Sequence, residues 1–346
     1  MTNPKFFLIA VCIILPGLLN LSSARAVDNP GSRRARHGVE AIWVDTRMTF
    51  HQQTEAGEYD SHFQGDYFNF HVKGSIADNL SFRIRQRFNK GIDQANPFNA
   101  TDFLYLRWQA TPKWSFTAGK QAILIGGYEI DSAPIDVYYY GAFSNRLNQY
   151  YAFGASVGYS PVPGQEISFQ FVPSPISPST QNRYSYNIYW NGGFASWWRT
   201  IWSTNLVEDI YGRKMNWLVL GNKFTANNFF VDIDLINRAS ANQKQLLFSD
   251  FSFICKAIWT VGKWNLCTKV GYESNSAENV DSQGLSYDLV LPAGHDYLYG
   301  GAGVEFFPFG DERLRLHAVL FRDNHDRVNN FDIGMTWRFT IYEKRF

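Results

Sequence analysis

Basic side chains recur at every second position in several segments of the chain, and this spacing is its main chemical signal. Arg83, Arg85 and Arg87 alternate with other residues, and Arg313 and Arg315 do the same near the C-terminus. If these segments are strands, alternate residues project from one face. Because arginine keeps its positive charge in proteins, a face of this kind attracts anions.

The basic residues predicted to line one wall of a water-filled interior are Arg47, Lys73, Arg83, Arg85, Arg87, Arg107, Arg313, Arg315 and Arg338. Closure of a sheet on itself places the last strand beside the first, which makes this wall continuous. In a narrow aqueous pore such a wall favours the passage of anions. The alternative is that the arginines only solvate the lumen and pair with Asp45 and Asp332.

The connection 123–149 is the second candidate functional segment, because it is unusually apolar and aromatic for a loop. Such a loop is unfavourable in water, so we expect it to fold inward as the third long loop and to narrow the interior. Its acidic residues Glu129, Asp131 and Asp136 would then face the basic wall and create a transverse electric field. The alternative is an outward loop that contacts a neighbouring subunit.

No pattern in the sequence indicates catalytic residues, a cofactor or a metal site. Gly154-Ala155-Ser156-Val157-Gly158 matches the nucleophile-elbow pattern by letter, but it lies inside an alternating segment and not at a strand-to-helix turn. No Cys and His pair has metal-ligand spacing, and no Walker or Rossmann glycine pattern occurs. The sequence therefore does not predict an enzyme.

The elements that must position these residues are β-strands. After the N-terminal region, apolar and polar side chains alternate over segments of about 10 to 13 residues, separated by turn residues. Phe68, Phe70 and Val72, for example, point to one side of their segment. Soluble β-sandwiches also alternate, so this pattern alone does not decide the fold class.

Further features favour an all-β fold, a transmembrane antiparallel β-barrel of about 16 strands. Short connections such as Gly192–Ala195 and Gly262-Lys263 alternate with long ones such as 53–64 and 123–149, as at the two rims of an outer-membrane barrel. Tryptophans gather near segment ends, as in an interfacial belt. They are Trp108, Trp114, Trp198, Trp202, Trp259 and Trp264.

The N-terminal segment has the features of a secretory signal peptide. Lys5 precedes an apolar stretch, and Ala24-Arg25-Ala26 has the small-x-small pattern of a cleavage site. An N-terminal anchor helix is the alternative. The predicted divisions are a signal peptide over 1–26, a linker over 27–38 and an outer-membrane barrel over 39–346.

Composition and cysteine positions set further limits. The formal net charge of +1 makes nucleic acid an unexpected partner, and the aromatic share of 17% excludes a disordered chain. Cys255 and Cys267 are predicted on opposite faces of two neighbouring strands, which disfavours a disulfide between them.

Three runs of residues are similar to those of a known protein family. They are the run from Tyr105-Leu106-Arg107 to Gly119-Lys120-Gln121, the run Gly126-Gly127-Tyr128-Glu129 and the run Pro134-Ile135-Asp136-Val137-Tyr138. They resemble the outer-membrane porin family called phosphate-selective porins O and P, most closely its branch from Bacteroidetes-type bacteria. The resemblance implies a sixteen-stranded, usually trimeric channel for small anions with a ladder of basic side chains. The residues of this chain that match such a ladder are Arg83, Arg85, Arg87, Arg107 and Lys120.

The expected function is passive diffusion of small hydrophilic solutes across a bacterial outer membrane, with a preference for anions such as phosphate. The expected partners are these solutes, outer-membrane lipid and further copies of the chain in a homotrimer, and no cofactor is expected. One alternative is a non-conducting structural or secretion-accessory barrel. The other is an outer-membrane enzyme, which would require a lipid-facing Ser–His pair.

Overall fold

The computed structural model describes residues 37–55, 57–92, 96–177, 182–240, 243, 245–324 and 328–344. The predicted signal peptide and nearly all of the predicted linker lie outside these residues, so both stay predictions. Residues His37–Phe346 form one compact unit. Within the described residues, no helix has the length and apolar character needed to cross a membrane.

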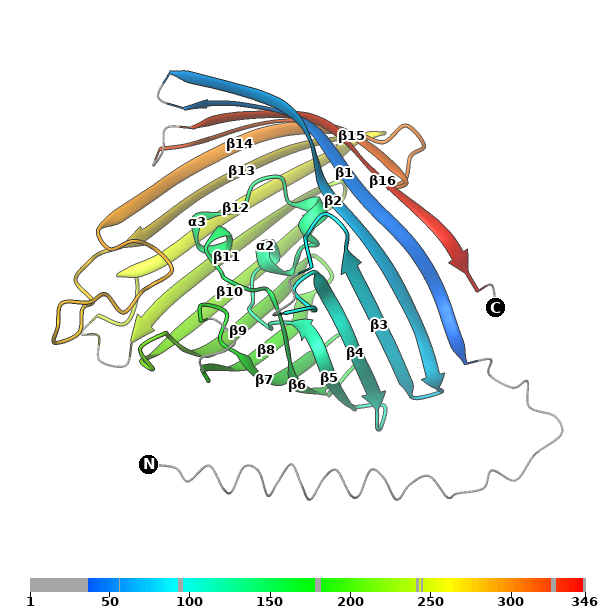
Figure 1. The fold of residues 1–346 in the computed structure, drawn as a ribbon, viewed down its shortest axis with the longest axis horizontal. Helices are drawn as coiled ribbons and strands as arrows, with labels where there is room; N and C mark the ends of the chain where they lie inside the picture. The colour runs from blue at the N-terminus through cyan, green and yellow to red at the C-terminus, as the bar shows by residue number, and fades with distance from the viewer. Residues whose placement is uncertain are drawn as a thin grey trace. The chain divides into compact units, whose positions relative to one another are not determined.

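Sixteen antiparallel strands in the described part of the chain close into a barrel, which confirms the predicted fold class (Figure 1). Each strand pairs with the next, and β16 pairs with β1. The strands are β1 (Gly38–Glu55), β2 (Glu58–Ala77), β3 (Leu80–Arg87), β4 (Thr101–Gln109), β5 (Trp114–Ala122), β6 (Tyr151–Tyr159), β7 (Glu166–Pro173), β8 (Tyr184–Ala195), β9 (Trp198–Glu208), β10 (Lys214–Ala226), β11 (Phe229–Ser240), β12 (Asp250–Val261), β13 (Trp264–Asn275), β14 (His295–Phe306), β15 (Leu314–Asp323) and β16 (Asn329–Glu343).

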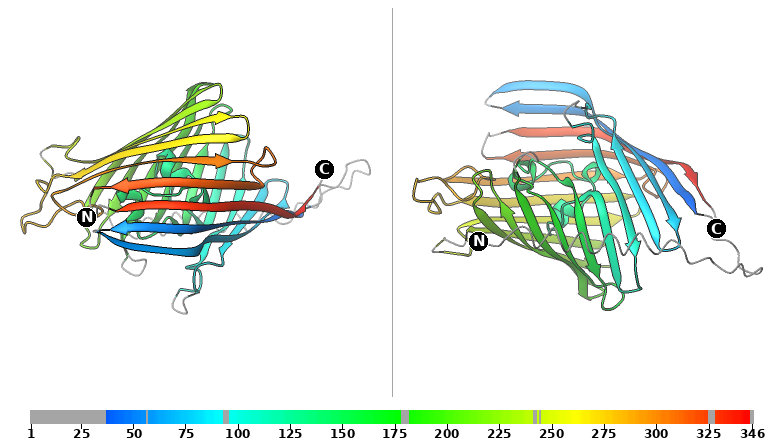
Figure 2. Two further views of the ribbon diagram at one scale, coloured as in Figure 1. Left: turned by 90° about the horizontal axis from the view of Figure 1, so that it is seen from above. Right: turned by 60° about the horizontal axis from the view of Figure 1, so that its bottom comes forward.

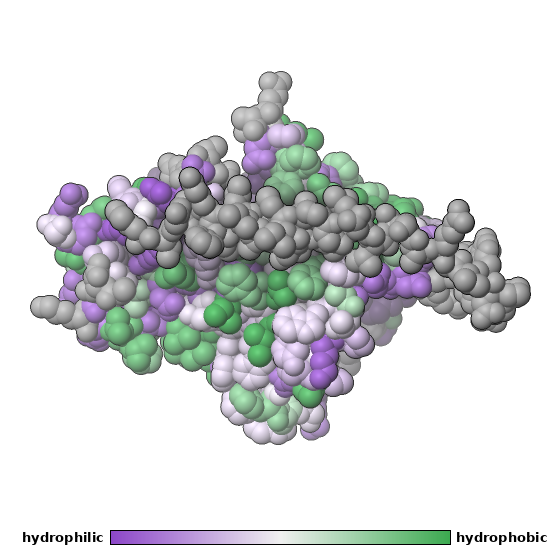
Figure 3. Space-filling view, turned by 90° about the horizontal axis from the view of Figure 1, so that it is seen from below, coloured by the Kyte–Doolittle hydropathy of each residue, from purple (hydrophilic) through white to green (hydrophobic). Residues whose placement is uncertain are grey.

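The outer face of the barrel is apolar because alternate residues of each strand point away from the lumen. Val270 on β13 is 51% exposed and Leu320 on β15 is 55% exposed. Figure 3 shows hydrophobic residues gathered on the visible outer face. Exposed apolar surface costs about 25 cal/mol per Å² in water, so this face fits a hydrocarbon phase.

The turn between β8 and β9 lies a few residues later than predicted. Gly192 and Gly193 belong to β8, and the turn is formed by Ser196 and Trp197. The side chain of Gln165 occupies the space beside Gly192, where an added Cβ would lie 1.9 Å from its Oε1 atom. The glycines therefore allow a close approach inside a strand instead of forming the turn.

The predicted long loop 53–64 is wrong, because β1 and β2 continue as a paired hairpin to Glu55 and Glu58 (Figure 2). Phe50 and Phe63 lie with their ring centroids 5.0 Å apart on this extension. The residues of this part are mostly polar on both faces, which is typical of a loop sequence. Backbone pairing does not require an apolar face, so the strands extend beyond the apolar zone.

The two cysteines lie on opposite faces of the wall. Cys255 pairs with Val270, Cys267 pairs with Ile258, and both cysteines are free. Cys267 lines a cavity together with Lys256 and Lys269. The prediction that the two cysteines lie on opposite faces is confirmed.

We expect a charged, water-soluble thiol reagent to modify Cys267 but not Cys255 when the barrel is embedded in lipid vesicles. The reagent reaches the lumen through water, whereas the Cys255 side chain faces the apolar phase. Peptide mass spectrometry locates the modified thiol, and Cys267→Ser is expected to abolish labelling. Modification of Cys255 alone would place the two faces the other way round.

Candidate functional site

The connection between β5 and β6 contains three short helices that lie within the ring of strands (Figure 1). We call residues 123–150 the inner segment. Its helices are α2 (Tyr128–Asp131), η2 (Pro134–Asp136) and α3 (Ala142–Asn145). Side chains from β1, β11, β13 and β15 bind its backbone, so it contacts several parts of the wall.

Asp234 of β11 binds the start of α2. Its carboxylate accepts hydrogen bonds from the backbone N–H groups of Tyr128 and Glu129, each over 2.8 Å. The first N–H groups of a helix have no partner within the helix. A buried carboxylate at this position gives these donors an acceptor and receives hydrogen bonds in place of those from water. Gly127 precedes the helix with φ 94°, and an added Cβ would lie 3.2 Å from this carboxyl group.

Glu273 of β13 binds the start of α3 in the same way. Its oxygens accept hydrogen bonds from the backbone N–H groups of Ala142 at 2.6 Å and Phe143 at 2.8 Å. The hydroxyl groups of Ser252 and Tyr299 also donate to it, at 2.6 and 2.7 Å. Glu273 is 0% exposed, and these donors replace the water that the buried carboxylate has lost.

The basic wall binds the carbonyl groups of the inner segment. Arg47 of β1 donates to the carbonyl oxygens of Ile135 at 3.2 Å and Val137 at 2.9 Å. Arg315 of β15 donates to the same Ile135 oxygen at 3.1 Å. Carboxylates thus bind N–H groups at the starts of α2 and α3, and guanidinium groups bind the carbonyl groups of Ile135 and Val137.

Tyr138 adds a hydrogen bond from an uncharged donor, next to the residues that Arg47 and Arg315 bind. Its hydroxyl group donates to Glu305 of β14 at 2.7 Å. Burial raises the pKa of Tyr138 above its usual value, so the phenol keeps its proton and remains a donor at physiological pH.

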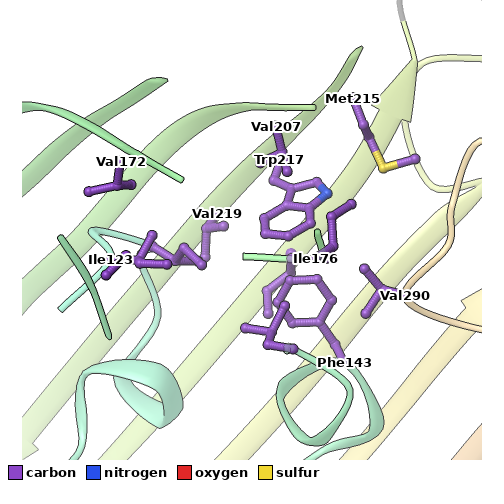
Figure 4. Close-up of a cluster of buried hydrophobic side chains, with 13 residues drawn as sticks. Ile123, Phe143, Val172, Ile176, Val207, Met215, Trp217, Val219 and Val290 are labelled. Atoms are coloured by element: carbon purple, nitrogen blue, oxygen red, sulfur yellow. The ribbon is translucent and has the colours of Figure 1, made fainter. Parts of the chain in front are cut away.

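Apolar packing accompanies these polar contacts. The ring of Phe143 in α3 meets the indole of Trp217 on β10 with 5.1 Å between centroids and 79° between planes (Figure 4). Val219 and Met215, on the same face of β10 as Trp217, are buried in the same cluster. These strand positions are apolar because they face the inner segment and not water, and each large buried side chain contributes about 1.5–3 kcal/mol.

Most of the predicted wall arginines have a carboxylate partner. Arg85 and Arg87 lie 3.0 and 3.1 Å from the two oxygens of Asp102, and Arg107 lies 3.2 Å from Glu166. The remaining pairs are Arg47–Asp66, Arg315–Asp136, Arg315–Glu305, Arg338–Asp136 and Arg338–Glu312. Asp45 and Asp332 form their ion pairs with His71 and His51.

Lys73 and Arg83 differ from these residues, because neither makes an ion pair with another described residue. They lie directly opposite each other on β2 and β3. Arg313 also differs from its predicted place. It precedes β15, pairs with Asp311 in the short turn at 2.9 Å, and its side chain is 69% exposed.

The acidic residues of the inner segment point to different parts of the wall. Asp136 meets Arg315 and Arg338 of the basic wall at 3.0 and 2.7 Å. Glu129 instead pairs with Lys269 on β13, and Asp131 accepts a hydrogen bond from Tyr189 on β8 at 3.4 Å. Only Asp136 of these three residues therefore faces the arginines.

The residues that the sequence reasoning missed are the wall carboxylates. Asp232 and Asp234 occupy alternate positions of one strand, and Glu273 and Glu305 have the same lumen-facing parity on theirs. The period-two pattern that located the arginines could have located these residues. Their partners in the inner segment could not have been found in this way.

Two of the cavities in the described part of the chain border the inner segment. One of about 240 Å³ is lined by Arg87, Lys90 and Lys120, with Asp102 as its carboxylate. The other, of about 80 Å³, has lining carboxylates from the inner segment and from β11 and β14, beside Lys256 and Lys269. The charges around the inner segment are therefore unevenly distributed, with excess positive charge beside β3 and more carboxylates beside β11.

Comparison with known proteins gives a family match for the N-terminal part of the barrel. The family model for phosphate-selective porin O and P matches residues 39–192. The predicted resemblance to this family is confirmed, while its Bacteroidetes-type branch stays a prediction. No curated protein matches the chain.

Solved structures with the same fold include several porins. An anion-selective porin from Comamonas acidovorans has a TM-score of 0.62 at 8% identity, with 88% of this chain and 100% of that chain covered. In-vitro folded OmpT of Vibrio cholerae, in its trimer form, has a TM-score of 0.60 at 13% identity, with coverage of 88% and 99%. OmpF of Salmonella typhi in complex with daunomycin has a TM-score of 0.60 at 12% identity, with coverage of 87% and 98%.

We expect Asp234→Asn to loosen the inner segment. A hydrogen bond to a charged group contributes about 1.5–3 kcal/mol, and the amide loses the charge that strengthens both bonds to α2. Single-channel recording is expected to show larger current noise and an added level of higher conductance. Asp232→Asn is the matched control, because Asp232 pairs with Lys223 and, among the described residues, accepts no hydrogen bond from the inner segment. Equal current noise in both variants would show that the loss of a negative charge, and not the loss of the hydrogen bonds to α2, causes the noise.

Proposed function

We infer that this chain, an outer-membrane porin similar to phosphate-selective porins O and P over residues 39–192, passes small anions more readily than cations. Diffusion follows the gradient of the solute and needs no cofactor. The proposal concerns the solute preference and the residues responsible for it. The porin character itself rests on the family match and on the barrel.

The observation that carries the proposal is the cavity beside β3, in which Arg87, Lys90 and Lys120 outnumber the carboxylate of Asp102. Along β3, Arg83 continues the basic row toward the short turns, about 13 Å from Arg87 at 3.3 Å per residue. An anion in this passage meets a positive group at each step. A cation meets net repulsion there.

We propose that the inner segment forms the constriction. Its contacts with the basic wall and with Asp234 and Glu273 support this role, because they hold it across the lumen. Glu129, Asp131 and Asp136 then contribute negative charge at the narrow part. Since most wall arginines are already paired, we expect a moderate anion preference and not exclusion of all other solutes.

We expect Lys90→Gln with Lys120→Gln to lower the anion-to-cation permeability ratio at least about twofold. A unit charge about 7 Å from the ion path changes the energy of the ion by about 0.6 kcal/mol in water, and salt reduces this effect. The reversal potential in a KCl gradient across a planar bilayer measures the ratio. Heat-modifiable migration of the folded barrel on gels verifies that the variant folds.

Arg313→Gln is the matched control for this measurement. It removes one positive charge from the exposed turn, where Asp311 already neutralises it, so the ratio is expected to stay unchanged. An unchanged ratio in the double lysine variant would show that the cavity beside β3 does not select ions. Intact barrels that carry no current would favour the non-conducting structural or secretion-accessory alternative.

We also propose a homotrimer, which the trimer form of the Vibrio cholerae neighbour supports. The apolar outer face allows barrel-to-barrel contact as well as contact with lipid. Light scattering of the purified protein in detergent, corrected for bound detergent, is expected to give three times the mass of one chain. A monomer mass at all protein concentrations would contradict the proposal.

A further inference from the structure

We propose that the lumen carries a binding platform for carboxylates borne on a planar ring, on the short-turn side of the inner segment. The platform consists of Trp43, Lys73, Arg83, Phe103 and Tyr105. It deepens the proposed function, on which it rests, by naming a class of solute that the channel favours over inorganic anions.

The strand register places these residues in two adjacent rows. In one row Lys73 lies opposite Arg83, and Arg83 lies opposite Tyr105. In the next row Trp43 and Phe103 occupy the two ends, with His71 and Arg85 between them. Neighbouring strands are about 4.8 Å apart, and alternate residues along a strand are about 6.7 Å apart. One small solute can therefore contact both rows.

The platform has positive charge without a counter-ion from any described residue. Like charges directly opposite each other destabilise a sheet, yet Lys73 and Arg83 make no ion pair among the described residues. The Nε atom of Arg83 is buried and has no hydrogen-bond partner in the described part of the chain. Arg85, two residues along β3, pairs with Asp102. A bound anion would give Lys73 and Arg83 the ionic partner that the described residues do not supply.

Aromatic rings surround this charge. The guanidinium carbons of Arg83 and Arg85 lie 4.5 and 4.4 Å from the ring centroid of Phe103. Phe103 meets Tyr105 edge-on at 5.8 Å, and Trp43 stacks on His71 at 4.5 Å with 12° between the planes. Trp43, Phe103 and Tyr105 are only partly buried, so they offer ring surface to the lumen.

The combination of these groups favours a ring-bearing anion over an inorganic one. Apolar ring surface in contact with water is unfavourable, and phosphate or chloride cannot cover it. A planar solute ring can stack on the aromatic side chains, while its carboxylate accepts hydrogen bonds from Arg83 and Lys73. The chemistry of the platform therefore matches an aromatic carboxylate.

The position of the platform makes it distinct from the cavity beside Lys120. Lys73 lies near the end of β2 that leads into the short turn to β3, and Arg83 lies near the start of β3. Arg87 and Lys120 lie toward the opposite ends of their strands. A solute that has passed the inner segment from the long-loop side therefore meets the platform next.

Benzoate is the probe, and acetate and inorganic phosphate are the comparison anions. Saturation-transfer NMR on the detergent-solubilised barrel measures binding, and block of the KCl current in planar bilayers measures occupancy of the lumen. We expect benzoate to bind and block at concentrations about 2- to 10-fold lower than acetate, since aromatic stacking adds to the shared carboxylate contact. Equal potency of benzoate, acetate and phosphate would overturn the proposal.

Two variants separate the ring contact from the charge contact. Tyr105→Leu is expected to raise the half-blocking concentration of benzoate toward that of acetate, with the acetate value unchanged. Arg83→Gln is expected to weaken both. Tyr159→Leu is the matched control, because Tyr159 pairs with the outward-facing Trp114 on the outer face. If the Tyr105→Leu variant kept the full preference for benzoate over acetate, the proposed ring contact of the platform would be contradicted.

The two readouts also distinguish this proposal from the proposed function. If benzoate binds selectively but the barrels carry no current, the platform stands and the porin proposal fails. If the barrels pass anions but bind benzoate no better than acetate, the platform fails and the anion-preferring porin stands.

Discussion

Closure of the sheet is the constraint on which the rest of the structure depends. Ala41 to Thr54 of β1 pair with Glu343 to Asn329 of β16, so the two terminal strands have partners on both sides. In a bilayer an unpaired backbone group costs several kcal/mol, and closure removes the free edge. Closure also gives every strand one face toward lipid and one toward the lumen, which is why alternate residues have opposite chemistry.

The inner segment changes what the lumen requires of each strand. Where β10 faces it, Trp217 and Val219 are buried and apolar. Where β11 and β13 face its helix starts, Asp234 and Glu273 replace water as partners of backbone N–H groups. The lumen side of the barrel is therefore a binding surface for a part of the same chain, as well as a path for solutes.

Several charges of the basic wall have a structural role. Arg47 and Arg315 bind carbonyl groups of the inner segment, and Arg85 is paired with Asp102, so these charges contribute mainly to positioning. Lys73 and Arg83 have no such partner within the residues that the structure describes. A count of arginines in the sequence therefore overestimates the charge that a solute meets, because paired charges cancel at a distance.

The period-two alternation, together with the alternating short and long connections, was enough to predict a barrel of about sixteen strands. With the short turn at Gly262-Lys263, the alternation also predicted the register that sets Cys255 opposite Val270. It could not distinguish a polar hairpin from a loop at 53–64, nor place Arg313 in the turn. The ion pairs and the docking of the inner segment depended on the tertiary structure. Tyr128 and Asp234 are 106 residues apart, and only closure of the barrel brings such groups within hydrogen-bond distance.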